Sequence, residues 1–224
     1  MNLHAIQILF LKDLFLSRRH LFAYFLGGMV SSALTCIPNK TISFVGFILM
    51  LTVAIAAGIH LIGQLMLAES SEQTRLFVMS LPVSLLDYSL GKISVVLTAY
   101  LIPWSTMFAC STILTFVLPW AKHGAVVVLP AIFLFLRCGF MVQLVTAVVT
   151  ESVGWTICVM VACNVLLNVF LTQLFAVPEI AAAKQSDIVV WPSQILQLLT
   201  IECAVIVGAL ATAIVLQTRK RDLV

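Results

Sequence analysis

Most of the clustered polar residues of the chain lie in one stretch, AESSEQTRLFVMSLPVSLLDYSLGK, which spans residues 68–92. Only 9% of the chain is charged, yet this stretch holds three acids and two bases. Its last two residues, Gly91 and Lys92, are the pair with which a phosphate-binding P-loop ends. A P-loop also requires a glycine five residues before that glycine and a Ser or Thr after the lysine, but Leu86 and Ile93 occupy those positions. We therefore expect no ATP site in this chain.

No other catalytic or metal-binding motif accompanies the stretch. The acids and the arginine between Glu69 and Arg75 faintly resemble the paired glutamates and arginine of some intramembrane proteases. The two acids are not adjacent, however, and neither an HExxH nor a GxSxG motif occurs with them. The six cysteines fall within apolar runs without a CxxC pair, as is typical of buried small hydrophobic side chains. We expect a chain that is not an enzyme, with no metal site and no cofactor of its own.

Two charged residues interrupt runs that are otherwise apolar. Arg137 lies 12 residues along the run 125–150, and Glu202 lies 9 residues along the run 193–217. An ionisable side chain at the centre of a membrane helix costs at least about 2.5 to 3.5 kcal/mol, so both should face protein or water. At 1.5 Å per residue their depths would differ by about 4 to 5 Å, which two long side chains can bridge. We predict an ion pair that either clasps two helices together or forms a polar feature beside a transport path.

A stripe of small polar residues lies on the apolar run 154–175. Asn164, Asn168 and Thr172 are spaced four apart and therefore share one helix face. Such groups often join membrane helices by hydrogen bonds worth about 0.6 kcal/mol on average. The stripe either joins two helices or lines a substrate route. In another apolar run, His60 is expected to be a hydrogen-bonded interior residue, with a proton relay as the alternative.

The elements that position these residues follow from hydropathy. The chain has 224 residues, is 62% hydrophobic and has a mean hydropathy of +1.16, which is more apolar area than a soluble domain of this size could bury. A membrane-spanning helix needs about 20 mainly apolar residues, whereas strands of a membrane barrel would give segments of about ten. We predict an all-α membrane protein with six transmembrane helices, over 21–37, 43–67, 93–117, 125–150, 154–175 and 193–217.

The distribution of lysine and arginine predicts the orientation, because short cytoplasmic loops are enriched in both. With the N-terminus inside, eight basic residues fall on the cytoplasmic side: Lys12, Arg18, Arg19, Arg75, Lys92, Arg219, Lys220 and Arg221. Only three fall outside: Lys40, Lys122 and Lys184. We therefore place both termini in the cytoplasm. The net charge of +3 reflects this topology and gives no reason to propose nucleic acid as a partner.

The first 20 residues are too polar to form a further span. Charged residues follow their first apolar run and no small-residue cleavage site appears, which is unlike a cleaved signal peptide. Because the segment is still rich in Leu, Ile and Phe, we predict an interfacial helix along the inner membrane surface over residues 1–20.

Residues 68–92 form the one cytoplasmic connection long enough to build structure. A serine at its start can cap a short helix, which must end just before Pro82. Ser84 then opens a Ser-Leu-Leu-Asp capping box, which predicts a second helix that runs from Leu85 into the third span. This arrangement fits either docking of a cytoplasmic partner or a solvated connector.

The sequence EQTRLFVMSLPVSLLDYSLGK, residues 72–92, resembles the loop between the second and third spans of type-2 ABC exporter permeases. That loop contains, in order, an acidic residue, a Thr or similar residue, an apolar helix, SLPVS or a near variant, and GK. The opening FLKDLFLSRR, residues 10–19, is similar to the basic segment before the first span of that family. Six spans, inside termini and short outer loops agree over essentially the whole chain. One departure is Gln73, where the family loop often has a glycine before the threonine.

The resemblance implies a coupling helix at about 71–80 that sits in a cleft of a cytoplasmic ATP-binding subunit, and it makes residues 1–20 the family's connecting helix. Carried over by position, the contact candidates are Glu69, Glu72, Arg75, Phe77 and Met79. The chain would be one permease of a dimer, identical or paralogous, in the bacterial inner membrane. ATP and Mg²⁺ would be bound by two separate ATPase subunits. Peptide, drug and haem export permeases all look broadly like this.

Two other classes of function stay open. A secondary transporter would use charges within the membrane, for which Arg137, Glu202 and His60 are the candidates. A membrane assembly or sensor subunit would bind the ATPase yet transport nothing. Transport in proteoliposomes without any ATPase would favour the secondary transporter.

Overall fold

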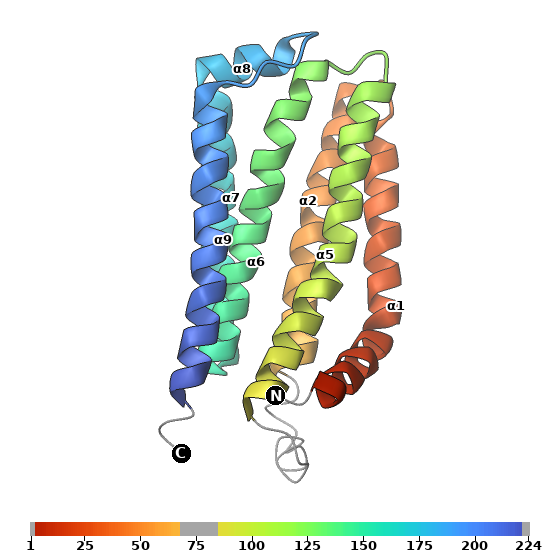
Figure 1. Cartoon of the computed structure of the whole chain (residues 1–224). Helices are drawn as coiled ribbons and strands as arrows, with labels where there is room; N and C mark the ends of the chain where they lie inside the picture. Colours follow the sequence, from red (N-terminus) through yellow and green to blue (C-terminus); the bar gives the residue numbers. More distant parts are fainter. Residues whose placement is uncertain (1–2, 68–84, 221–224) are drawn as a thin grey trace.

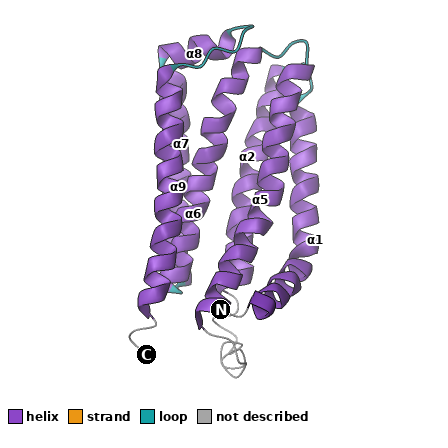
Figure 2. Ribbon diagram, viewed as in Figure 1, coloured by secondary structure: helices purple, strands orange, loops and turns teal. Residues whose placement is uncertain are grey.

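The computed structural model describes residues 3–67 and 85–220, and in these two ranges the chain forms helices joined by loops, with no strand (Figure 2). The all-α fold expected from hydropathy is confirmed. The helices are α1 (Leu3–Thr35), α2 (Lys40–Ile62), α5 (Leu85–Val117), α6 (Val128–Thr150), α7 (Val153–Ala176), α8 (Pro178–Gln185) and α9 (Ser193–Lys220). A π-helical turn, η1 (Gly63–Leu67), follows α2, and a 3-10 helix, η2 (His123–Val127), precedes α6.

The long helices run side by side in two groups (Figure 1). In one group α1 packs against α2 and α5, and in the other α6 packs against α7 and α9. Contacts of α6 with α2 and α5 join the two groups. The short α8 lies across one end of the bundle, whereas the first turns of α1 and the last turns of α9 lie at the opposite end.

Five segments of the described chain are long and apolar enough to cross a membrane, which makes this a multi-pass membrane protein. They are Lys40–Leu67, Leu90–Val117, His123–Thr150, Val153–Ala176 and Ser193–Leu216. The expected spans that agree with them to within a few residues are 43–67, 93–117, 125–150, 154–175 and 193–217.

The boundary expected near residue 20 does not separate two helices. α1 is continuous from Leu3 to Thr35, and its first turns lie at an angle to the rest (Figure 1). No proline or glycine lies at the boundary to break the helix. The uncharged part of α1 after Arg19 is shorter than the five spans, so α1 is not among them. A sixth span over 21–37 and a surface position for 1–20 stay predictions.

Aromatic side chains hold α5 against α6 in the middle of the bundle. Tyr100 stacks on Phe140 with ring centroids 3.8 Å apart. Trp104 donates its indole N–H to the Phe133 carbonyl at 2.9 Å, which satisfies the only donor of a side chain that is otherwise apolar. These contacts fix which face of α6 turns toward α5.

At the α8 end, Gly124 permits a close contact between η2 and the segment after α7. Its N–H donates to the Ser186 carbonyl at 3.0 Å, and a Cβ atom at this position would lie 1.9 Å from the Ala183 carbonyl oxygen. Beside this contact, Lys122 and Asp187 form an exposed ion pair at 2.7 Å. The connection between α7 and α9 therefore forms a small cap over this end of the bundle.

The cysteines are not uniformly buried, contrary to expectation. All six lie in the described residues and are free thiols. Cys138 on α6 is buried, but Cys158 on α7 and Cys203 on α9 are exposed. The reason is that α7 and α9 are the least covered of the five spans, whereas α6 is covered by helices of both groups.

Candidate functional site

The five candidate coupling residues, Glu69, Glu72, Arg75, Phe77 and Met79, lie outside the described residues. The elements that flank them are described. In the described chain, η1 extends to Leu67 and α5 is helical from Leu85, and the helix start predicted at Leu85 coincides with the edge of the described residues and stays a prediction. Both flanks lie at the end of the bundle opposite α8, together with the first turns of α1 (Figure 1).

A buried ion pair joins α1 to α5 close to these flanks. The Lys92 ammonium nitrogen lies 2.7 Å from an Asp13 carboxylate oxygen, and the two side chains are 5% and 2% exposed. Tyr88, one turn earlier on α5, places its ring centroid 5.7 Å from the same nitrogen. The Lys12 ammonium nitrogen lies 3.8 Å from the other Asp13 carboxylate oxygen, but the Lys12 side chain is mostly exposed. Asp13 and Lys92 thus fasten the N-terminal part of α1 to the first turns of α5.

Burial makes this contact sensitive to the loss of either charge. Taking an ion out of water costs several kcal/mol, which a partner offsets only at close range, so removing one partner typically costs about 3 to 5 kcal/mol. Sequence reasoning missed the pair because it counted Lys92 as a cation of a cytoplasmic loop and gave Asp13 no role. The sequence did offer one signal: the acid Asp13 and the base Lys92 each lie next to an apolar run.

The predicted ion pair between Arg137 and Glu202 is wrong for this structure. Glu202 is 4% exposed, and neither of its carboxylate oxygens has a hydrogen-bond partner among the described residues. The Arg137 guanidinium carbon instead lies 5.6 Å from the centroid of the Trp104 ring on α5. Its Nε likewise has no hydrogen-bond partner in the described part of the chain.

The prediction rested on the similar depths of Arg137 and Glu202 in the membrane. It did not take into account the direction in which each side chain points around its helix axis. Successive residues of an α-helix point about 100° apart around the axis. On α6 the residue that faces α9 is Cys138, whose thiol donates to the Glu202 backbone carbonyl at 3.3 Å. Arg137, its neighbour in sequence, consequently points toward α5.

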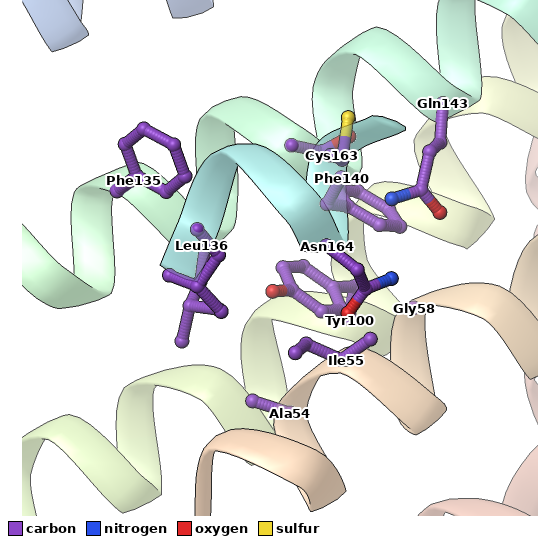
Figure 3. Close-up of a pocket in the computed structure, with 12 residues that line it drawn as sticks. Ala54, Ile55, Gly58, Tyr100, Phe135, Leu136, Phe140, Gln143, Cys163 and Asn164 are labelled. Atoms are coloured by element: carbon purple, nitrogen blue, oxygen red, sulfur yellow. The ribbon is translucent and has the colours of Figure 1, made fainter. Parts of the chain in front are cut away.

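A small cavity lies between α2, α5, α6 and α7 (Figure 3). Its volume is about 30 Å³, which is room for about two water molecules. Polar side chains of Tyr100, Gln143, Cys163 and Asn164 line it, among apolar and aromatic neighbours. Because a drug-sized ligand needs a pocket of about 300 Å³ or more, this conformation admits water but no large substrate.

The polar stripe on α7 is divided between this cavity and the surface. Asn164 lines the cavity, whereas Asn168 and Thr172 are exposed. Each of the three side chains donates to the backbone carbonyl one turn earlier, at 2.8 or 2.9 Å. Within the described chain these hydrogen bonds stay inside α7, so they do not join two helices. The stripe was predicted either to join two helices or to line a substrate route. Only the second role stays open, and only for Asn164.

Comparisons with known proteins identify no relative. No protein family model, no curated protein and no solved structure matches the chain. The candidate site therefore rests on the residues and contacts described above.

Proposed function

We propose that the chain is the membrane-spanning permease subunit of an ATP-binding cassette exporter in the bacterial inner membrane, with both termini in the cytoplasm. The observation that carries the proposal is the sequence of residues 68–92, which resembles the coupling region of type-2 exporter permeases. Their flanks, η1 and α5, lie at the same end of the bundle as the first turns of α1. A coupling helix and a connecting helix would meet at such a place.

The buried ion pair supports the proposal because it links this end mechanically. A protein that moves the connection between η1 and α5 would act on the first turns of α5, which contain Lys92. Lys92 is bonded to Asp13 of α1, and separating the two would remove the close contact that offsets the cost of burying both charges. The first turns of α5 and the N-terminal part of α1 should therefore move together.

In the proposed cycle, ATP binding closes two ATPase subunits and moves the docked coupling helices of two permeases, identical or paralogous. The contacts would be Glu69, Glu72, Arg75, Phe77 and Met79. The movement would rearrange the interface between the permeases and open the substrate path outward. Nucleotide drives such a shift only if it binds the two states with different affinity. ATP and Mg²⁺ stay on the ATPase, and this chain supplies no catalytic residue.

The small cavity is consistent with a chain that supplies half of a pathway. Its polar groups come from α5, α6 and α7, but its volume of about 30 Å³ is far below that of a substrate chamber. In the proposed dimer the substrate path would lie at the interface with the second permease, beside this cavity, which is lined by four helices of one chain. Asn164 and Tyr100 are the side chains that we propose lie beside the path.

Co-purification with an ATP-binding protein tests the proposal. Phe77→Asp and Glu72→Arg should each weaken ATPase binding by at least about tenfold, as loss of an interface anchor does. Two controls at the α8 end should bind normally: Ile188→Asp, which also replaces an apolar side chain by Asp, and Glu179→Arg, which repeats the Glu→Arg change. If Phe77→Asp and Glu72→Arg still bind the ATPase and transport as the wild type does, the assignment of the coupling region is wrong.

The reconstituted chain separates the other classes of function. Transport by proteoliposomes that contain this chain alone would identify a secondary transporter. A complex that binds the ATPase, yet shows no ATP hydrolysis stimulated by peptides, haem, lipids or drugs and no transport, would identify an assembly or sensor subunit. The permease proposal predicts transport only with ATP and the ATPase present.

A further inference from the structure

Two histidines face each other between α1 and α2. The ring centroids of His20 and His60 are 4.6 Å apart, and the ring planes are tilted by 43°. Tyr24, one turn after His20 on α1, places its ring edge-on to His60 at 5.9 Å. The sequence predicts an interior, hydrogen-bonded His60 but gives His20 no role. The structure therefore brings together a pair that the spacing along the chain does not reveal.

Each ring has a buried nitrogen without a partner. His20 Nδ1 and His60 Nε2 have no hydrogen-bond partner among the described residues. Gln64, one turn after His60, has a side chain that interacts with the His60 ring. A neutral imidazole has one N–H and one lone pair. In the tautomer with its proton on Nδ1, His60 keeps its lone pair on the buried Nε2, which is how metal-binding histidines are commonly oriented.

We propose that His20 and His60 bind one divalent transition-metal ion of the Ni²⁺ or Cu²⁺ type between α1 and α2. Metal–nitrogen bonds of about 2.0 to 2.1 Å place an ion about 3.2 Å from each ring centroid. With both unpartnered nitrogens directed at the ion, centroids 4.6 Å apart correspond to an angle of about 90° at the ion, as between neighbouring ligands of square-planar Cu²⁺ or Ni²⁺. A tetrahedral ion would separate the centroids to about 5.2 Å.

The site has open coordination positions. Within the described residues, no group of three or more His, Cys, Asp or Glu side chains comes together, so water or an incoming ligand must complete the shell. Gln64 belongs to the π-helical turn η1, a local structure that is frequent at functional sites. An ion here would bridge α1 to the end of α2 that leads into residue 68. This inference does not depend on the proposed function.

The first test titrates the full chain, purified in detergent with a tag that contains no histidine, with Ni²⁺ by calorimetry. One ion should bind per chain, and His20→Ala and His60→Ala should each weaken binding by about tenfold or more. Gln64→Ala should weaken it by about tenfold through loss of orientation. The control is His123→Ala, which removes an exposed histidine at the α8 end and should change nothing. Equal binding by all variants would mean an adventitious ion only and would overturn the proposal.

The second test needs no variant to fold. Electron paramagnetic resonance of the wild-type chain with one equivalent of Cu²⁺ should show hyperfine coupling to two imidazole nitrogens. The coupling should disappear on acidification, because protonated histidines release the metal. A spectrum with oxygen ligands alone would overturn the proposal, whatever the behaviour of the variants.

Discussion

Two regions of this bundle bury charge, and they do so in opposite ways. At the end away from α8, Asp13 and Lys92 meet at 2.7 Å and join α1 to α5. On the far side of α5, Arg137 lies over the Trp104 ring, and the Glu202 carboxylate has no partner among the described residues. Both sets of residues lie at compatible depths along their helices. The difference is direction, because only Asp13 and Lys92 point into the same interface.

The comparison shows what fastens the helices in each region. α1 and α5 pack closely along their length and are also joined at one end by the buried charge pair of Asp13 and Lys92. α6 and α9 are held by close packing and by the thiol of Cys138, which donates to the backbone of α9. A charge placed in an apolar run therefore does not by itself predict a clasp between helices.

The largest expected effect comes from breaking the buried pair. Lys92→Met removes the ammonium and leaves the Asp13 carboxylate buried, which should destabilise the chain by about 3 to 5 kcal/mol. Asp13→Leu together with Lys92→Met should recover most of this loss, because no uncompensated charge remains. Circular dichroism during unfolding in detergent measures the stability of the single and the double variant. If Lys92→Met lowers the free energy of unfolding by less than about 1 kcal/mol, the pair contributes no more than an ordinary surface ion pair.

A smaller loss of stability is expected from changing Trp104, the ring over which the Arg137 guanidinium lies. Trp104→Phe keeps an aromatic ring but removes the indole N–H that bonds to the Phe133 carbonyl, and it weakens the contact with the guanidinium. The loss should be about 1 to 2 kcal/mol. The control, Trp120→Phe, changes an exposed tryptophan at the α8 end and should leave the unfolding midpoint unchanged. If both variants unfold alike, Trp104 is not the partner of Arg137.

A double-mutant cycle sharpens the comparison further. Because Arg137 and Glu202 do not touch, Arg137→Met and Glu202→Gln should add with a coupling energy below about 0.5 kcal/mol. The charge swap, Arg137→Glu with Glu202→Arg, should likewise rescue neither single reversal. Coupling of about 2 kcal/mol or more would show that the two side chains pair in the folded chain.

The smallest effect is expected at the exposed pair of Lys122 and Asp187. The pKa of Asp187 lies below its ordinary value because Lys122 donates a hydrogen bond to it and adds a nearby positive charge. The pair therefore contributes stability above the unfolded pKa of about 4, and loses it as pH falls through the lower folded pKa. Lys122→Met should unfold slightly earlier than the wild type at pH 6. The difference should shrink as pH falls through the lowered folded pKa of Asp187 and vanish below it, and one that persists there would come from packing.

Hydropathy predicts much of this fold. Five of the predicted spans coincide with helices. The helix start predicted from Pro82 and the capping box at Ser84 falls at the edge of the described residues and stays a prediction. These features depend on a few neighbouring residues, so a sequence displays them directly. By contrast, α1 runs through residue 20 without a break, because a change in polarity alters where a helix lies and does not end it.

The site contacts were harder to predict because they join distant segments. Asp13 meets Lys92, and His20 meets His60, only after the helices have packed with a particular rotation about their axes. Depth in the membrane can be counted along a sequence, but that rotation depends on side-chain packing, here on rings such as Tyr100 and Phe140. The Arg137 prediction failed for this reason. The candidate coupling residues between 68 and 84 lie outside the described residues and stay predictions.

Photo-cross-linking in cells tests the central claim most directly. A photoreactive amino acid placed at position 77 should cross-link the chain to a protein that carries a P-loop, G-x-x-x-x-G-K-[ST], in its sequence. The same amino acid at position 188, at the α8 end, should not. Cross-linking to no P-loop protein at position 77, or equal cross-linking at both positions, would contradict the assignment of residues 68–92 as the contact with an ATPase.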